Sequence, residues 1–206
     1  MKNYLLVLYL IFTLPIVAQV QKENKNPTQN KWKLELLYSH DILNTSYGKN
    51  YGYIFKGKLI FLDRKHFTLS YGLAHQNSYI DETENLFTEY IDGYTRDIGL
   101  YSIFDITYYP FNKKKFYLSL EPFIGATHLK SKGKLKIPQY SISEKYKNEY
   151  VYFNYGFSQS IGYNIHKFSV SGFAWVSLKG LLDQGRSRPA DFDSRFFIGV
   201  GLGYRL

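Results

Sequence analysis

The sequence predicts an all-β protein: an eight-stranded antiparallel up-and-down β-barrel that spans a membrane. Three observations lead to this fold class. Eight segments alternate apolar and polar residues with period two, which is the pattern of strands with two different faces. One face of every segment is apolar and uncharged, whereas the other carries charges and small residues. Short and long connections alternate along the chain.

The expected strands follow one another from residue 31 to the end of the chain. They lie near residues 31–40, 51–62, 67–77, 97–109, 115–128, 150–162, 167–179 and 195–206. In chain order, their apolar faces include Trp32, Tyr53, Leu69, Phe104, Leu120, Phe153, Val170 and Ile198. The connections are short at 63–66, 110–114 and 163–166, and long at 41–50, 78–96, 129–149 and 180–194.

The apolar face is expected to point outward, into lipid. It is too aromatic for the interior of an eight-stranded barrel, which only just holds packed side chains. The opposite face, rich in Gly and Ser, fits there easily. A closed barrel leaves no unpaired strand edge in the membrane. Because transmembrane barrels have short periplasmic turns and long external loops, the long connections are expected to be external.

The composition fits one folded domain. The chain has 206 residues, of which 45% are hydrophobic and 19% aromatic, so it is too apolar for a disordered protein. It has no Cys, which excludes disulfides and thiolate chemistry. The net charge is +9, but the basic clusters are short and no nucleic-acid motif occurs, so nucleic acid is not an expected partner.

The first 18 residues have the layout of a secretory signal peptide. Lys2 precedes an apolar run, and Pro15 interrupts the segment before Ala18, a residue suited to the cleavage position. The alternative is an uncleaved anchor, although the apolar run is shorter than the ~20 residues of a spanning helix. Residues 19–30 are polar and read as a flexible leader. The barrel is expected over residues 31–206.

The inward face is expected to carry a network of charges. Its members are Lys33, Glu35, Lys56, Lys58, Asp105, Glu121, Lys179, Arg195 and Arg205. Because unpaired buried charges are costly, we expect Glu35 to pair with Lys56 or Lys58, and Glu121 with Lys56 or Arg205. A polar lumen filled by side chains is the expected result, and a narrow pore is the alternative.

The end of the chain carries a family resemblance. Gly201, Tyr204 and Leu206 follow the C-terminal assembly signal of bacterial outer-membrane barrels. Over residues 31–206 the chain resembles the small eight-stranded barrels of the OmpA/OmpX-like group. This resemblance implies the outer membrane of a Gram-negative bacterium, insertion by the barrel-assembly machinery, and contact with outer-membrane lipid and lipopolysaccharide. Such barrels are structural proteins, adhesins, resistance factors or lipid A enzymes, so the fold does not decide the function.

The external loops 78–96, 129–149 and 180–194 are the expected site of a structural or surface-interaction role. The second of these is basic and contains Lys130, Lys132, Lys134, Lys136, Lys145 and Lys147. Lysines attract anions as point charges, so these residues suit the phosphates of lipopolysaccharide; a solvated rim is the alternative. No cofactor or metal is expected, and the partner of the loops stays open.

A lipid A-modifying enzyme of the deacylase type is the alternative function. The stretch from His75 to Ser78 resembles the His-x-Ser-Asn segment of outer-membrane lipid A deacylases, with Asn77 where the Ser would stand. His75, Ser78 and Glu89 would then form the catalytic set. The sequence has no metal-ligand spacing and no nucleophile elbow, so a role without catalysis is favoured.

Overall fold

The computed structural model describes residues 31–41, 50–81, 84–86, 89–137, 140–178 and 196–206. The expected signal peptide, the leader, loop 180–194, Lys179 and Arg195 lie outside this part of the chain. The strands are β1 (Lys31–Asp41), β2 (Asn50–Asp63), β3 (Phe67–Asp81), β4 (Glu84–Leu86), β5 (Glu89–Tyr108), β6 (Phe116–Ile137), β7 (Ile142–Ile165), β8 (Phe168–Ser177) and β9 (Phe196–Arg205).

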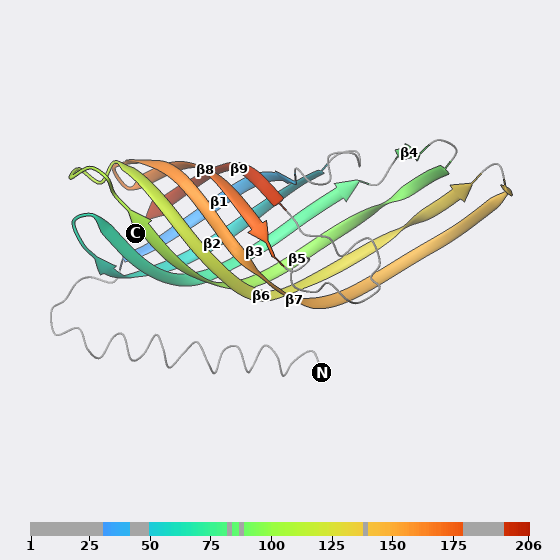
Figure 1. Cartoon of the computed structure of the whole chain (residues 1–206), viewed down its shortest axis with the longest axis horizontal. Helices are drawn as coiled ribbons and strands as arrows, with labels where there is room; N and C mark the ends of the chain where they lie inside the picture. Colours follow the sequence, from blue (N-terminus) through green and yellow to red (C-terminus); the bar gives the residue numbers. More distant parts are fainter. Residues whose placement is uncertain (1–30, 42–49, 82–83, 87–88, 138–139, 179–195) are drawn as a thin grey trace. The chain divides into compact units, whose positions relative to one another are not determined.

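Eight of these strands close into a ring, and the residues from Trp32 to Leu206 form one compact unit (Figure 1). Hydrogen-bonded neighbours follow the order β3-β2-β1-β9-β8-β7-β6-β5, and pairing of β3 with β5 closes the ring. All pairings are antiparallel, and β1 pairs with β9 from Lys33 opposite Arg205 to Asp41 opposite Phe197. The short β4 pairs only with β5. The predicted eight-stranded up-and-down barrel is confirmed.

The exterior of the ring is apolar, as the alternation predicts. Many outward positions of the strands carry exposed hydrophobic residues, for example Leu34, Leu36 and Tyr38 in β1 and Ile198, Val200 and Leu202 in β9. Among the described residues, no helix is long and apolar enough to span a membrane. The alternation of exposed apolar and buried small or polar residues is the pattern of strands that face lipid outside and a filled lumen inside.

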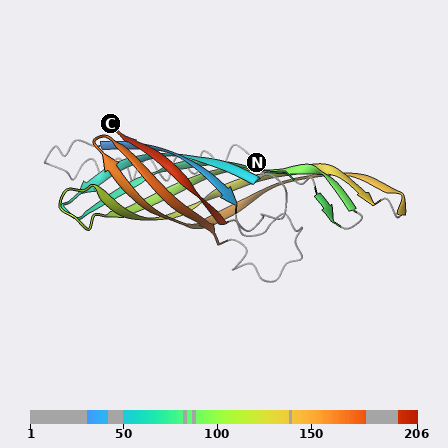
Figure 2. The same cartoon turned by 90° about the horizontal axis from the view of Figure 1, so that it is seen from above.

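The strands extend further at the external end than the sequence predicts. Segments 78–96 and 129–149 were expected as loops, but β3 continues to Asp81, β5 begins at Glu89, and β6 and β7 pair without interruption as far as Ile137 opposite Ile142. Residues 89–97, 129–137 and 142–150 thereby form a three-stranded projection, which we call the external ribbon (Figure 2). The point at which the outward positions change from apolar to charged residues marks the membrane surface. Backbone pairing continues beyond that point.

The opposite end has short turns, as expected. The chain reverses between β2 and β3, between β5 and β6, and between β7 and β8. Two of these turns contain a residue with positive φ that is not Gly: Lys114 at 49° and His166 at 56°. The side chain of Asn164 donates a hydrogen bond of 2.8 Å to the carbonyl of Lys114, which holds these two turns side by side.

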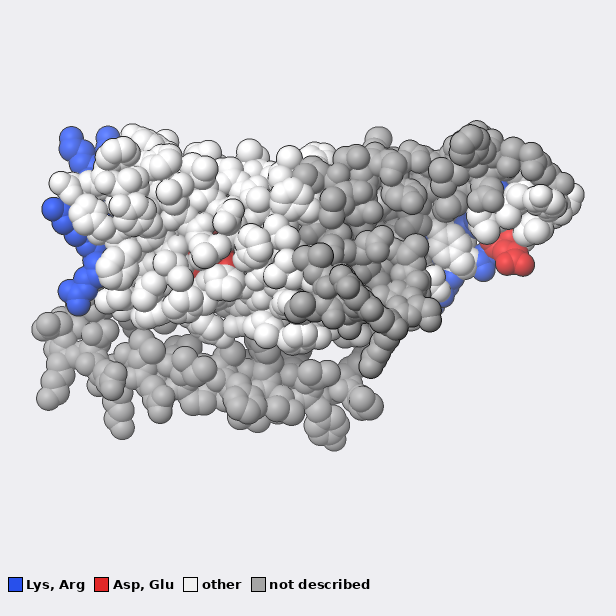
Figure 3. Space-filling view, viewed as in Figure 1, with Lys and Arg blue, Asp and Glu red and all other residues white. Residues whose placement is uncertain are grey.

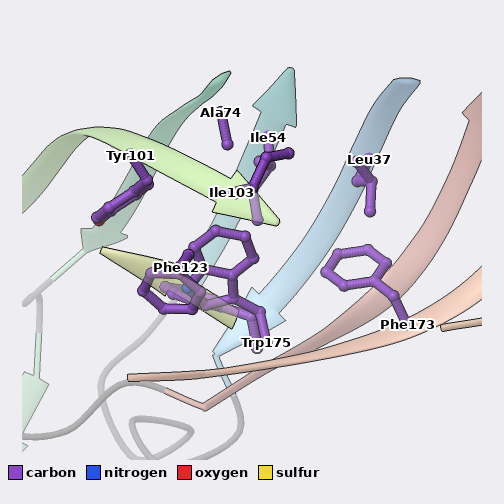
Figure 4. Packing of buried hydrophobic residues seen from close by; sticks show 9 residues of the cluster. Leu37, Ile54, Ala74, Tyr101, Ile103, Phe123, Phe173 and Trp175 are labelled. Carbon is purple, nitrogen blue, oxygen red and sulfur yellow. The ribbon is translucent and has the colours of Figure 1, made fainter. Parts of the chain in front are cut away.

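The lumen holds an aromatic cluster that the prediction of a polar interior missed. Phe123 and Trp175 stack with ring centroids 3.9 Å apart, and Tyr101 lies 5.0 Å and 5.4 Å from them (Figure 4). The cluster, here called the aromatic layer, consists of Leu37, Ile54, Ala74, Tyr101, Ile103, Phe123, Phe173, Trp175 and Phe197. The lumen is thus filled by an apolar cluster in addition to the polar side chains that the sequence predicts.

Inward glycines make room for these rings. A Cβ atom on Gly99 would stand 2.2 Å from the Tyr101 hydroxyl oxygen, and one on Gly156 would stand 2.8 Å from the Phe123 ring. The small residues on the inward face therefore do not leave a wide polar channel. They accept large side chains from the neighbouring strands, so the lumen stays closely packed.

Candidate functional site

A group of six charged side chains fills the lumen towards the short-turn end. The Lys58 ammonium lies 2.7 Å from each of three carboxylates, those of Glu35, Asp105 and Glu121. Lys33 pairs with Glu35 at 2.6 Å, and Lys56 pairs with Glu121. The group, here called the charged layer, contains Lys33, Glu35, Lys56, Lys58, Asp105 and Glu121. Three ammonium groups thus face three carboxylates, and their formal charges cancel.

Hydroxyl groups complete the charged layer. Asp105 accepts hydrogen bonds from Ser70 at 3.2 Å, from Thr107 at 2.8 Å and from Ser119 at 3.0 Å. Lys58 is only 1% exposed, so its charge depends on protein partners rather than water. Buried charges persist in proteins when they are paired and hydrogen-bonded. The geometry is that of a packed polar plug.

The structure decides between the pairings that the sequence left open. Glu35 pairs with Lys58, and Glu121 contacts both Lys56 and Lys58. Arg205 lies at the short-turn mouth, next to a cavity that Lys33 also lines. Lys179 and Arg195 lie outside the described residues. Lys56 also stands 5.5 Å from the centre of the Trp175 ring, where the charged layer meets the aromatic layer.

The residues of the alternative catalytic set are not brought together. His75 and Ser78 are three positions apart on β3, so strand alternation places them on opposite faces. Ser78 is buried in the lumen, whereas His75 follows Leu73 on the outer face. The side chain of Glu89 is not described. Since a hydroxyl nucleophile and its base must lie within hydrogen-bond reach, the geometry does not support this set. Among the described residues, no group of His, Asp or Glu has the arrangement of a metal site.

The external ribbon presents a row of lysines on its outer face. Lys132 is directly opposite Lys147, and Lys134 is directly opposite Lys145. Directly opposite residues of an antiparallel pair project from the same face, and like charges in this position repel each other. Lys132 also lies 5.2 Å from the centre of the Tyr94 ring on β5. The sequence supplied these lysines, but their cross-strand register emerged only from the structure.

A belt of polar side chains separates this lysine row from the apolar exterior. Arg96 donates a hydrogen bond of 2.9 Å to Asn77, which in turn donates one of 2.6 Å to the Tyr53 hydroxyl. One strand further round, His128 and Glu149 lie 2.9 Å apart. Arg96 was not predicted as a site residue. It is the charged residue that follows the apolar outward positions of β5 towards the external end, and this change from apolar to charged could have identified it from the sequence.

The spacing along β6 places the lysines above the hydrocarbon. Its outward positions from Phe116 to Ala126 carry no charge. Ten residue steps span about 33 Å along a strand and rise about 25 Å at a tilt of about 40°, which is the height of the apolar band of a transmembrane barrel. Lys130 and the following lysines continue on the same face. They therefore lie at the level of lipid headgroups and beyond.

Comparisons with known proteins bear on the fold. No protein-family model and no curated protein matches the chain. Among solved structures, Ail, the attachment invasion locus protein of Yersinia pestis, is similar with a TM-score of 0.51 and 15% identity over 87% of this chain and 100% of that one. Neisserial surface protein A has a TM-score of 0.40 and 10% identity, over 84% of this chain and 95% of that one.

A further similar structure is the N-terminal β-barrel domain of Pseudomonas aeruginosa OprF, with a TM-score of 0.38 and 9% identity over 86% of this chain and 98% of that domain. At 15% identity, the likeness to Ail establishes the fold alone. The fold is that of the small eight-stranded outer-membrane barrels, as the resemblance of the sequence implied. Together with the apolar exterior, it supports the predicted location in the outer membrane of a Gram-negative bacterium.

Proposed function

We propose that this protein is an outer-membrane surface barrel whose external ribbon binds phosphate groups of outer-leaflet lipopolysaccharide. The observation that carries this proposal is the placement of Lys132 opposite Lys147 and of Lys134 opposite Lys145 on one face. Each pair places two lysines side by side, where like charges repel each other. Asp92 of β5 stands opposite Lys134, whereas the residue of β5 opposite Lys132 is Tyr94, so the pair of Lys132 and Lys147 is the better suited to an external anion. The row stands on the same strand faces that are apolar closer to the short turns, so the phosphate groups of the membrane surface lie within its reach.

The chemistry of the row favours a phosphate over a neutral ligand. Four exposed lysines, Lys132, Lys136, Lys145 and Lys147, flank the half-buried Lys130 and Lys134. Ammonium groups bind phosphate as flexible point charges, and each basic residue near an anionic membrane surface contributes about 1 kcal/mol. Glu149 stands opposite Lys130 at the lower edge of the row, next to the polar belt, and does not interrupt the lysine pairs above it.

The other functions that the sequence left open lack such support. The deacylase set does not assemble, because His75 and Ser78 lie on opposite faces of β3. A narrow pore would have to pass both the charged layer and the aromatic layer, in which Lys58 and Trp175 are 1% and 0% exposed. A surface role through the ribbon requires neither catalysis nor a passage.

The route to the membrane is part of the same proposal. Residues 1–18 would direct secretion and be removed, and residues 19–30 would remain as a leader. Gly201, Tyr204 and Leu206 lie on or directly after β9, where the barrel-assembly machinery would recognise the last strand. The alternation of Gly201 and Gly203 in the lumen with Leu202 outside is suited to such a strand.

The test is the affinity of the detergent-purified barrel for lipopolysaccharide, measured with a fluorescent lipid A probe by thermophoresis. We expect the variant Lys132→Gln/Lys145→Gln/Lys147→Gln to bind up to about 100-fold more weakly, since about 1 kcal/mol is lost for each lysine. Binding of the unsubstituted protein should also weaken as salt is added, and enzymatically dephosphorylated lipopolysaccharide should bind poorly.

The matched control removes three charges at the other end of the barrel, at positions that do not line a cavity there, as Lys31→Gln/Arg64→Gln/Lys65→Gln. This variant should keep the affinity of the unsubstituted protein for the lipid A probe. Equal losses in the two variants would point to a general effect of net charge and would overturn the assignment to the ribbon. Equal binding of the dephosphorylated ligand would overturn the assignment to phosphate.

A further inference from the structure

The barrel has a second cationic region, at the mouth formed by its short turns. A cavity of about 550 Å³ opens there, and its lining includes Lys33, Lys113, Lys115, Lys167 and Arg205. Lys and Arg gather at this end of the molecule, on the left of Figure 3. Among the described residues that line the cavity, none is Asp or Glu. A concave site lined by one sign of charge concentrates the opposite sign, so the ligand expected here is an anion.

The basic groups converge from separate parts of the chain. Lys33 belongs to β1 and Arg205 to β9, while Lys113 and Lys115 come from the turn before β6 and Lys167 from the turn before β8. Two of the lining lysines have carboxylate partners: Lys33 pairs with Glu35, and Lys114 pairs with Asp63. The six lysine and arginine side chains that line the cavity therefore outnumber these two carboxylates.

The turns that carry these cations are built as a fixed pair. The backbone N–H of Asn164 donates to the carbonyl of Lys115 at 2.6 Å, and its side chain donates to the carbonyl of Lys114 at 2.8 Å. Lys114 and His166 occupy the left-handed region, at φ of 49° and 56°, where Gly would be the unstrained choice. Both residues line the cavity. Two residues of its lining therefore carry side chains at backbone positions that favour Gly.

One wall of the cavity is apolar and belongs to the lipid-facing exterior. Tyr163 and Ile165 line the cavity and are 45% and 52% exposed. They continue the outward face of β7 beyond Ile161, which is 58% exposed. A free anion would use only the basic wall. A ligand that joins an anionic head to a hydrocarbon chain would use both walls at once.

We propose that this cavity binds an anionic phospholipid, with the phosphate-bearing headgroup among Lys113, Lys115, Lys167 and Arg205 and an acyl chain against Tyr163 and Ile165. The site lies at the end of the barrel opposite the external ribbon, so it does not depend on the function proposed for the ribbon. It would anchor the short-turn end in the leaflet that faces the periplasm, which fixes the barrel's height in the membrane.

The experiment uses the full barrel in lipid nanodiscs and a tryptophan beside the cavity. Tyr163→Trp introduces the reporter and Trp32→Phe removes the other lipid-facing tryptophan, whereas Trp175 is buried in the lumen and 0% exposed. Quenching is measured with phosphatidylglycerol or phosphatidylcholine that carries brominated acyl chains, at equal mole fractions in a phosphatidylcholine background. We expect phosphatidylglycerol to be preferred by about fivefold or more.

Adding Lys113→Gln/Lys115→Gln/Lys167→Gln should bring that preference down to about one. Lys31→Gln/Arg64→Gln/Lys65→Gln, which removes as many charges at the same end but outside the lining, should leave it unchanged. Equal quenching by the two lipids in the parent reporter, or an unchanged preference in the first triple variant, would overturn the proposal.

Inorganic phosphate is titrated into the barrel in detergent and followed by ³¹P line broadening. Specific broadening without a lipid preference would assign the cavity to a free anion and equally overturn the lipid site.

A second measurement avoids substitution near the lining. Native mass spectrometry of the unsubstituted barrel, released from detergent with equal amounts of the two lipids, should show retained phosphatidylglycerol at several times the level of phosphatidylcholine. Loss of this excess in the first triple variant supports the site. Equal retention of the two lipids by the unsubstituted barrel contradicts it, whatever the reporter variant does.

Discussion

The charged layer and the aromatic layer fill adjacent parts of one lumen by different means. In the charged layer, Lys58 alone contacts three carboxylates at 2.7 Å, and Asp105 holds three hydroxyl groups. In the aromatic layer, whose members are all uncharged, Phe123 and Trp175 stack with ring centroids 3.9 Å apart. Both layers are buried in the lumen, but only the first depends on a balance between opposite charges.

The difference concerns what happens when one side chain is lost. A buried ion pair adds little net stability over an apolar pair of the same shape, yet removal of one partner leaves an uncompensated buried charge. The loss of an aromatic side chain costs buried area and packing but leaves no unpaired charge. The charged layer should therefore be the less tolerant of single substitutions, and the more tolerant of substitutions made in balanced pairs.

The largest effect is expected from Lys58→Met. This change leaves Glu35, Asp105 and Glu121 with two ammonium groups in place of three, and should lower the free energy of unfolding by about 3–5 kcal/mol. Urea unfolding in lipid vesicles, followed by tryptophan fluorescence, measures the change. Lys65→Met, at an exposed turn position, is the control and should stay within about 0.5 kcal/mol. Similar losses in both variants would contradict the special position of Lys58.

A smaller effect is expected in the aromatic layer from Gly99→Ala. The new methyl group would stand 2.2 Å from the Tyr101 hydroxyl oxygen and displace it from Gln76, to which it donates a hydrogen bond of 2.8 Å. Overpacking of this kind costs about 1–3 kcal/mol, measured by the same unfolding experiment.

The matched control for Gly99→Ala is Gly57→Ala, also within a strand. There the nearest heavy atom, in the Leu34 side chain, is 3.8 Å from the added Cβ, so no side chain must move. We expect this control to be neutral or slightly stabilising, because Ala restricts the unfolded chain. If both variants lost the same stability, the glycines would serve strand geometry rather than space for the rings.

The smallest effect is expected from the balanced double variant Lys56→Met/Glu121→Leu. It removes one ammonium group and one carboxylate together, and Lys58 keeps Glu35 and Asp105. The free energy of unfolding should change by no more than about 1 kcal/mol, whereas Glu121→Leu alone should cost about 3 kcal/mol. A double variant as unstable as Lys58→Met would show that hydrogen-bond geometry, and not charge balance, holds this layer together.

Particular elements show how far the sequence predicts the fold. The apolar alternation predicts the eight strands of the ring, and the links at 63–66, 110–114 and 163–166 match the three short turns. The predicted positions of the external ends of β5, β6 and β7 were wrong. The backbones of Thr, Tyr and Lys pair as well above the membrane as those of Leu and Phe do within it. The apolar alternation indicates which residues contact lipid, and it does not indicate where backbone pairing ends.

The candidate sites divide in the same way. The sequence identifies Lys56, Lys58, Glu35, Asp105 and Glu121 as inward, but offers two possible partners for Glu35 and for Glu121. It also identifies the lysines of segment 129–149 without their register. The aromatic layer was missed, because Tyr101, Phe123 and Trp175 lie on the inward face among small residues and charges, and a one-dimensional pattern does not show which strands bring them into contact.

By itself, the sequence determined which face of each strand meets lipid and how many strands cross the membrane, because strand alternation and apolarity are local properties of consecutive residues. Only the tertiary structure decided which inward side chains pair, how the rings stack beside Gly99 and Gly156, and which lysines stand opposite one another. These contacts join strands that are distant in sequence, and their partners follow from the stagger of the closed ring, which depends on every strand pairing at once.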